Sequence, residues 1–192
     1  KNEDRVVLSF NIAQSFGAFE QIGCAAACHV KERLGDVSVA GKAYRFAMHT
    51  NDAGETGDVW HWKATRSNPL GFADDQYWDV ASRKQDGPTD FVVANTMTLA
   101  DGGAEPRYMA AGGVNANVDY IFLGDAGAPA AVAFDGTGAT AGARIPGFAH
   151  QRASPNKEDI KAMGKWAGGK WTVELKRALT NGDPYDAQFP LK

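Results

Sequence analysis

Both cysteines of this 192-residue chain lie in one short stretch, at Cys24 and Cys28, and His29 directly follows the second of them. A cysteine pair followed at once by a histidine is typical of covalent haem c attachment, in which each thiol adds to a vinyl group of the haem and the histidine ligates the iron. Here three alanines form the spacer, whereas two residues are usual. These small side chains would allow the segment to coil closely against a porphyrin face.

Three other interpretations of the same residues stay open. A Cys24–Cys28 disulfide is geometrically possible, but it closes a very short ring and constrains the chain little. A zinc site with His29 needs a fourth ligand and usually a second pair of ligands. Free buried thiols also fit, because cysteine packs as a small hydrophobic residue. Residue types and spacing favour haem c without excluding these.

Composition limits the class of protein. The length suits one ordinary domain, and a hydrophobic content of 44% with ten Phe and five Trp suffices for one sizeable core. The formal net charge of -3 provides no basic surface for nucleic acid. The sequence contains no apolar run of the roughly 20 residues that a membrane span requires. Because bacteria attach haem c outside the cytoplasm, the motif predicts an exported protein, periplasmic or extracellular.

Short extended segments must position these residues, because the 22 glycines fall mostly in turn dipeptides. Apolar patterns predict strands at residues 5–12, 37–48, 58–66 and 119–123, and a hairpin of residues 159–166 and 170–179 around a Gly-Gly turn. Trp166 and Trp171 would pair across that turn. Residues 68–87 and most of 99–147 are predicted to be long irregular connections. The sequence therefore predicts a mainly β protein, a β-sandwich with long loops.

Residues 58–66 show the clearest alternation. Trp60 and Trp62 point to one side, and His61 and Lys63 point to the other. Two tryptophans bury a large apolar area, so their face is expected to be core. His61 is then expected on the opposite face of the strand.

Several stretches in this order resemble a known family. They are the cysteine motif at 23–29, D-V-W-H-W-K-A-T-R at 58–66, N-P-L-G-F-A-D-D-Q-Y at 68–77 and the tryptophan-rich hairpin at 159–184. Together they resemble the haem-binding domain of the gamma subunit of ethylbenzene dehydrogenase and related molybdenum enzymes. The resemblance implies a single haem-binding domain over 1–192, an immunoglobulin-like or carbohydrate-module-like β-sandwich with one haem. It also implies electron transfer rather than catalysis, with a redox partner protein, other cytochromes or molybdenum enzyme subunits as partners.

The sequence departs from that gamma subunit in two ways. The subunit holds haem b through a methionine and a lysine without covalent links, whereas this chain resembles the c-type branch of the family. The family usually also has strands before Lys1 and after Lys192, and the strand that carries the gamma subunit's lysine ligand would fall beyond Lys192. We therefore carry over no lysine ligand, and we expect either flanking strands outside this stretch or a fold closed by a partner.

An electron-transfer haem needs two strong axial ligands, usually His or Met. The motif makes His29 the first ligand. We choose His61 as the second, because it matches the Trp-His-Trp-Lys signature of the c-type relatives, and the predicted metal ligands are therefore His29 and His61. His49 follows closely, and Met48 roughly matches the gamma subunit's methionine ligand. His150, in a loop, is the weakest candidate. Each candidate also has an ordinary interpretation. His61 would be a structural histidine and His49 a solvent-facing loop histidine. Met48 would fill a gap in the core, and His150 would be a surface residue.

The remaining candidates are haem contacts and a cation site. The candidate partners of the haem propionates are basic side chains: Lys63, Arg66 and Arg83. Trp60 is a candidate for packing at the haem edge, after its role in the core. Asp74 and Asp75 could hold a calcium ion, but such a pair is more often a solvated turn.

The sequence shows no Ser-His-Asp order, no Gly-rich phosphate loop and no paired general acid and base. No set of residues therefore supports a catalytic function. The alternative of a different class is a carbohydrate-like binding module of the same fold, without haem and with a Cys24–Cys28 disulfide. A third possibility is an accessory haem subunit of a molybdenum oxidoreductase.

Overall fold

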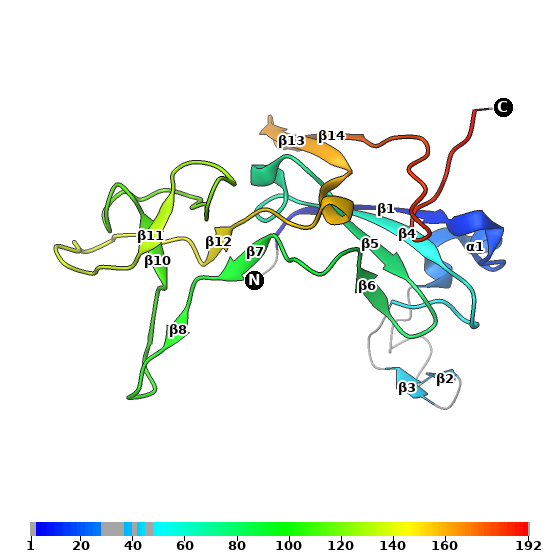
Figure 1. Ribbon diagram of the computed structural model, residues 1–192, viewed down its shortest axis with the longest axis horizontal. Coiled ribbons are helices and arrows are strands. Elements are labelled where there is room, and N and C mark those ends of the chain that lie inside the picture. Colours follow the sequence, from blue (N-terminus) through cyan, green and yellow to red (C-terminus); the bar gives the residue numbers. More distant parts are fainter. Residues whose placement is uncertain (1–2, 28–36, 40–41, 45–47, 192) are drawn as a thin grey trace.

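The structure, a computed structural model, describes residues 3–27, 37–39, 42–44 and 48–191 of the chain (Figure 1). Short antiparallel strands make up most of its regular structure, and each helical segment spans only three or four residues. The strands are β1 (Arg5–Asn11), β2 (Val37–Val39), β3 (Lys42–Tyr44), β4 (Gly57–Lys63), β5 (Asp74–Trp78), β6 (Arg83–Gln85), β7 (Val92–Ala94), β8 (Met97–Thr98), β9 (Ala104–Glu105), β10 (Tyr108–Ala110), β11 (Ala131–Ala133), β12 (Phe148–His150), β13 (Lys161–Ala167) and β14 (Lys170–Lys176). The helical segments are α1 (Phe19–Ile22) and the short 3-10 helices η1 (Ile12–Gln14), η2 (Gly23–Ala26), η3 (Asn68–Leu70) and η4 (Pro155–Glu158).

The central element is a four-stranded antiparallel sheet with the strand order β1-β4-β5-β6. β4 lies between β1 and β5, and its His61 is opposite Val7 of β1 and Asp74 of β5. Because side chains alternate along a strand, β4 gives the sheet two distinct faces. We call the face that carries His61 the histidine face, and the one that carries Trp60 and Trp62 the tryptophan face.

The β13–β14 hairpin packs over the tryptophan face of the sheet. Trp62 is fully buried there and meets Trp171 of β14 with 5.0 Å between ring centroids. The hairpin turns at Gly168 and Gly169, whose φ angles of 56° and 77° suit glycine, as a two-residue hairpin turn requires. Trp166 pairs with Trp171 across the turn, as the sequence predicts, at 5.6 Å between centroids.

Smaller two-stranded sheets lie beyond the central one (Figure 1). They are the pairs β2–β3, β7–β12, β8–β9 and β10–β11. In Figure 1 the β8–β9 and β10–β11 pairs extend to the left, away from the central sheet. The mainly β architecture is thus confirmed, whereas the immunoglobulin-like or carbohydrate-module-like topology stays a prediction. Within the described ranges, no helix is both long and apolar enough to cross a membrane.

Two local predictions are wrong. Residues 68–87, predicted to be irregular, contain β5 and β6. The polar residues of β5 do not give the apolar pattern of a buried strand, because their burial depends on partners from distant segments. Residues 119–123, predicted to be a strand, form only isolated bridges at Phe122, to Ala130 and His150.

Candidate functional site

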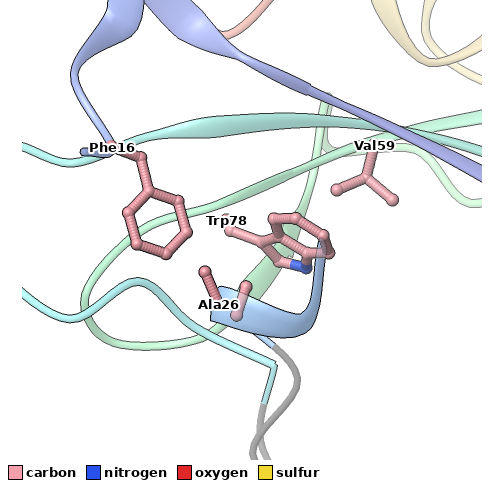
Figure 2. Close-up of a cluster of buried hydrophobic side chains, with 5 residues drawn as sticks. Phe16, Ala26, Val59 and Trp78 are labelled. Atoms are coloured by element: carbon pink, nitrogen blue, oxygen red, sulfur yellow. The ribbon is translucent and has the colours of Figure 1, made fainter. Parts of the chain in front are cut away.

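The start of the cysteine motif lies against the histidine face of the central sheet. Ala26 and Ala27 are buried and pack with Phe16 on Val59 and Trp78, as Figure 2 shows for the residues it labels. Small side chains allow the segment to approach the indole of Trp78 this closely. Cys28 and His29 lie outside the described residues.

Cys24 itself is turned away from this core. Its thiol is free, and the residue is exposed. Gly23, with φ of 60°, makes the bend between α1 and η2 that brings Cys24 to this position. An exposed thiol on a segment held down by its alanines is accessible to a reactive group of a ligand.

His49 and Met48 lie beside the motif. The backbone N–H of His49 donates to the carbonyl oxygen of Ala27 at 3.2 Å, and its ring Nδ1 lies 2.6 Å from the carbonyl oxygen of Thr50. His49 is fully buried, in contrast to the accessible loop position that the sequence suggested. Met48 packs, partly buried, on the same cluster as Ala27. The structure thus brings two of the predicted ligand candidates to the cysteine segment.

His61 lies in the middle of β4 on the same face as Val59, and only 2% of it is exposed. Its ring Nδ1 is 3.2 Å from Oε1 of Gln76 on β5. The amide nitrogen of Gln76 donates to Oδ2 of Asp74 at 2.8 Å, and the ammonium group of Lys63 donates to the same oxygen. Because the Gln76 amide nitrogen serves Asp74, the amide oxygen faces His61 and accepts the Nδ1 proton. This chain of donors therefore fixes the tautomer of His61.

The other ring nitrogen of His61 is left with its lone pair. Nε2 is buried and has no hydrogen-bond partner in the part of the chain that the structure describes. Burial, reinforced by the nearby charge of Lys63, lowers the pKa of His61 to about 3, so the ring is neutral at physiological pH. A neutral imidazole that donates from Nδ1 and presents Nε2 is the form that binds a metal ion.

Two of the three predicted propionate contacts, Lys63 and Arg66, form ion pairs with other residues. Lys63 is buried and paired with Asp74; burial lowers the pKa of Lys63 and raises that of Asp74. Nε of Arg66 donates to Oε1 of Glu3 at 2.6 Å. Arg83, in contrast, is exposed on β6, with Nη1 at 3.8 Å from Sδ of Met48. Of the three basic side chains, Arg83 is therefore the one that lies next to the motif cluster.

Trp60 and His150 lie away from this site. Trp60 is on the tryptophan face, where the guanidinium group of Arg177 stacks over its ring at 4.7 Å. The sequence suggested that His150 is a surface residue, but it is a buried residue of β12. Its Nε2 is 3.0 Å from the carbonyl oxygen of Thr65, and its Nδ1 is 3.4 Å from that of Ile121. Both ring nitrogens of His150 therefore already have polar partners.

Asp74 and Asp75 do not form a solvated turn. Both are fully buried in β5, on opposite faces of the sheet. Asp74 belongs to the His61 network, where Lys157 adds a second buried cation with Nζ at 3.6 Å from Oδ1. Sequence reasoning missed Gln76 and Lys157. A polar residue two positions after Asp74 was the available signal for Gln76, but its meaning depends on the pairing of β4 with β5.

Comparison with known proteins gives one match. A family model described as "Ethylbenzene dehydrogenase" matches residues 1–192, which is the whole chain. Comparisons with curated proteins and with solved structures return no match.

Proposed function

Since the chain belongs to the ethylbenzene dehydrogenase family, we propose that it is a haem-bearing electron-transfer domain that exchanges single electrons with a redox partner. Membership of this family supports a role as a subunit of an oxidoreductase complex. The observation that carries the proposal is His61: a neutral, buried imidazole with a fixed tautomer and an Nε2 without a partner among the described residues. It lies on the sheet face that the cysteine segment covers.

In this proposal, Cys24 and Cys28 would hold one haem covalently, and His29 and His61 would ligate its iron. The residues described fit such a group, because Cys24 offers an accessible thiol and His61 a lone pair without a competing donor. When bound, the haem supplies a reversible one-electron couple at its iron. His49, which is buried beside Ala27, is the other candidate for the second ligand. We favour His61 because Gln76, which orients its ring, is itself hydrogen-bonded to Asp74 of the buried Lys63–Asp74 ion pair.

The protein's own contribution is orientation and exclusion of water. Gln76 accepts from Nδ1 of His61, which holds the ring plane and increases the basicity of Nε2. Phe16 and Trp78, both fully buried, pack with Ala26 and Ala27 and exclude water from that side of the motif segment, whereas Cys24 stays exposed. Redox groups in dry surroundings reorganise little when their charge changes, so this arrangement suits electron transfer rather than acid–base catalysis.

The proposal extends to place and partners. Covalent haem attachment in bacteria implies export, so we expect the domain in the periplasm or outside the cell. We expect its redox partner to be a further subunit of the complex, including a molybdenum subunit, or another cytochrome.

The test is an absorption spectrum of protein matured in a host that attaches haem c. We expect a Soret band, a c-type pyridine haemochrome, an intact mass increased by one haem and a low-spin iron. His61→Ala should give a high-spin spectrum, whereas the matched His49→Ala variant should stay low-spin. No Soret band would refute haem binding, and a b-type haemochrome would refute covalent attachment. A low-spin His61→Ala protein together with a high-spin His49→Ala protein would transfer the ligand role to His49.

A further inference from the structure

Six aspartates converge on the side of the molecule away from the histidine face. They come from β4, β5, the residue after β6, the segment before β13 and the segment after β14: Asp58, Asp75, Asp86, Asp159, Asp183 and Asp186. Two groups of three share Asp186, and in each group one oxygen from each carboxylate lies within 4.8 Å of the others. Within the described residues, every salt bridge to these carboxylates comes from a single cation, Arg177.

Arg177 fills the first group. Its Nη1 lies 2.9 Å from Oδ2 of Asp58, 3.6 Å from Oδ2 of Asp75 and 2.8 Å from Oδ1 of Asp186. Nη2 donates to the carbonyl oxygen of Ala187 at 2.6 Å. The guanidinium group therefore occupies the space where an ion could bind these three carboxylates.

The second group, Asp86, Asp183 and Asp186, has no such cation of its own. Neither Asp86 nor Asp183 forms a salt bridge with any described residue. Asp86 is only 5% exposed, and its Oδ2 is buried without a hydrogen-bond partner in the same part of the chain. An ionised carboxylate in such surroundings is costly unless a positive charge compensates it.

The chemistry of the group suits calcium. All the donors are oxygens, and calcium takes six to eight oxygen ligands at 2.3–2.6 Å, so two ligands of one ion lie at most about 5 Å apart. Magnesium demands near-octahedral geometry, whereas calcium accepts the irregular positions of ligands from separate loops. A surface cleft of about 410 Å³, lined by Asp159, Asn181 and Asp183 among others, reaches Asp183 and has room for water ligands.

We propose that Asp86, Asp183 and Asp186 bind a calcium ion that ties the C-terminal segment to the end of β6. Existing contacts already place the segment there. Asn181 donates to Asp186 and, at 3.0 Å, to Asp159, and Tyr185 stacks on Tyr77 of β5 at 4.0 Å between centroids. In Figure 1 the C-terminal segment, in red, runs from β14 back toward β4. The ion would join Asp183 and Asp186 of the C-terminal segment to Asp86, where these carboxylates now face one another.

Calorimetric titration of the chelator-treated holoprotein tests the site. We expect wild type to bind one Ca²⁺ per chain, more tightly than Mg²⁺, with a rise in melting temperature. Asp86→Asn and Asp183→Asn should each weaken binding roughly tenfold or more. Asp119→Asn, the control, removes one carboxylate charge from an exposed residue elsewhere and should bind as wild type does. Should Asp86→Asn fail to fold, Asp183→Asn carries the comparison, because an asparagine oxygen can still accept from the N–H of Tyr185.

Trypsin provides a local measurement, since Lys176 and Arg177 precede the C-terminal segment. Calcium should slow cleavage there in wild type and in Asp119→Asn, but not in Asp86→Asn. No binding at millimolar Ca²⁺, tighter binding of Mg²⁺ or wild-type affinity in both cluster variants would overturn the site. In each of these three cases, protons or another ion would neutralise the carboxylates instead. Calcium binding without an effect on cleavage would overturn the tie to the C-terminal segment.

Discussion

Replacing Gln76 with leucine tests the network behind His61. Gln76 is 1% exposed and makes two hydrogen bonds, to His61 and to Asp74. The first joins uncharged groups and contributes about 0.5–1.5 kcal/mol; the second has a carboxylate acceptor and contributes about 1.5–3 kcal/mol. Gln76→Leu should therefore lower the free energy of unfolding by about 2–4 kcal/mol. For a chain of this length, that corresponds to a decrease of roughly 5–15 °C in melting temperature.

Under the proposed ligation of the haem iron by His61, the same variant should change the redox potential in a defined direction. An acceptor on Nδ1 makes the imidazole more basic, which favours the oxidised iron, so removing it should raise the midpoint potential. A difference of about 0.5–1 kcal/mol between the two oxidation states corresponds to roughly 20–40 mV, since a one-electron couple shifts 59 mV per tenfold change. Spectroelectrochemistry and thermal unfolding provide the two measurements. Gln21→Leu makes the same chemical change at an exposed residue and should alter neither. An unchanged melting temperature or a lower potential in Gln76→Leu would refute the network.

Three further predictions concern packing, buried charge and pH. Gly164→Ala places a methyl group in steric overlap with Cζ2 of Trp62 and should lower the free energy of unfolding, measured by chemical denaturation, by about 1–3 kcal/mol, whereas Gly147→Ala, with nothing within 4 Å, should not. Arg177→Met leaves three buried aspartates without their cation and should cost about 3–5 kcal/mol in the same assay; full wild-type stability would contradict this. Burial holds the pKa of His150 below its usual 6.5, so the unfolded state takes up this proton first and stability falls as pH drops below about 6.5. Unfolding curves of His150→Gln between pH 7 and 5 should show a smaller decrease than wild type.

Sequence patterns predict the parts of this fold that local chemistry determines. The β13–β14 hairpin follows from its Gly-Gly turn, its alternating side chains and the Trp166–Trp171 pair, all within one short stretch. β4 follows from its alternation in the same way. β5 could not be predicted so, because its run of Asp, Asp and Gln becomes a buried strand only when cations from elsewhere in the chain meet those side chains.

The residues of the candidate site also fall into two groups, those that local sequence reveals and those that only tertiary contacts reveal. The cysteine motif and His61 are recognisable because their residue types and spacing have a chemical meaning of their own. The partners that orient His61 are not, since Gln76 reaches it only through the register of β4 with β5. His150 is the opposite case: an unremarkable histidine in the sequence that tertiary contacts bury between two carbonyl oxygens.

β4 is hydrogen-bonded along both edges and buried on both faces, apart from the partly buried Trp60. Its amides should exchange with solvent only when the whole domain opens, because no partial opening frees a strand enclosed on four sides. The strand carries His61 on one face and, on the other, Asp58, which Arg177 joins to Asp186 of the proposed calcium site. A ligand bound at either face therefore opposes the same global opening, and two such ligands would add their contributions to the free energy of opening without any contact between them.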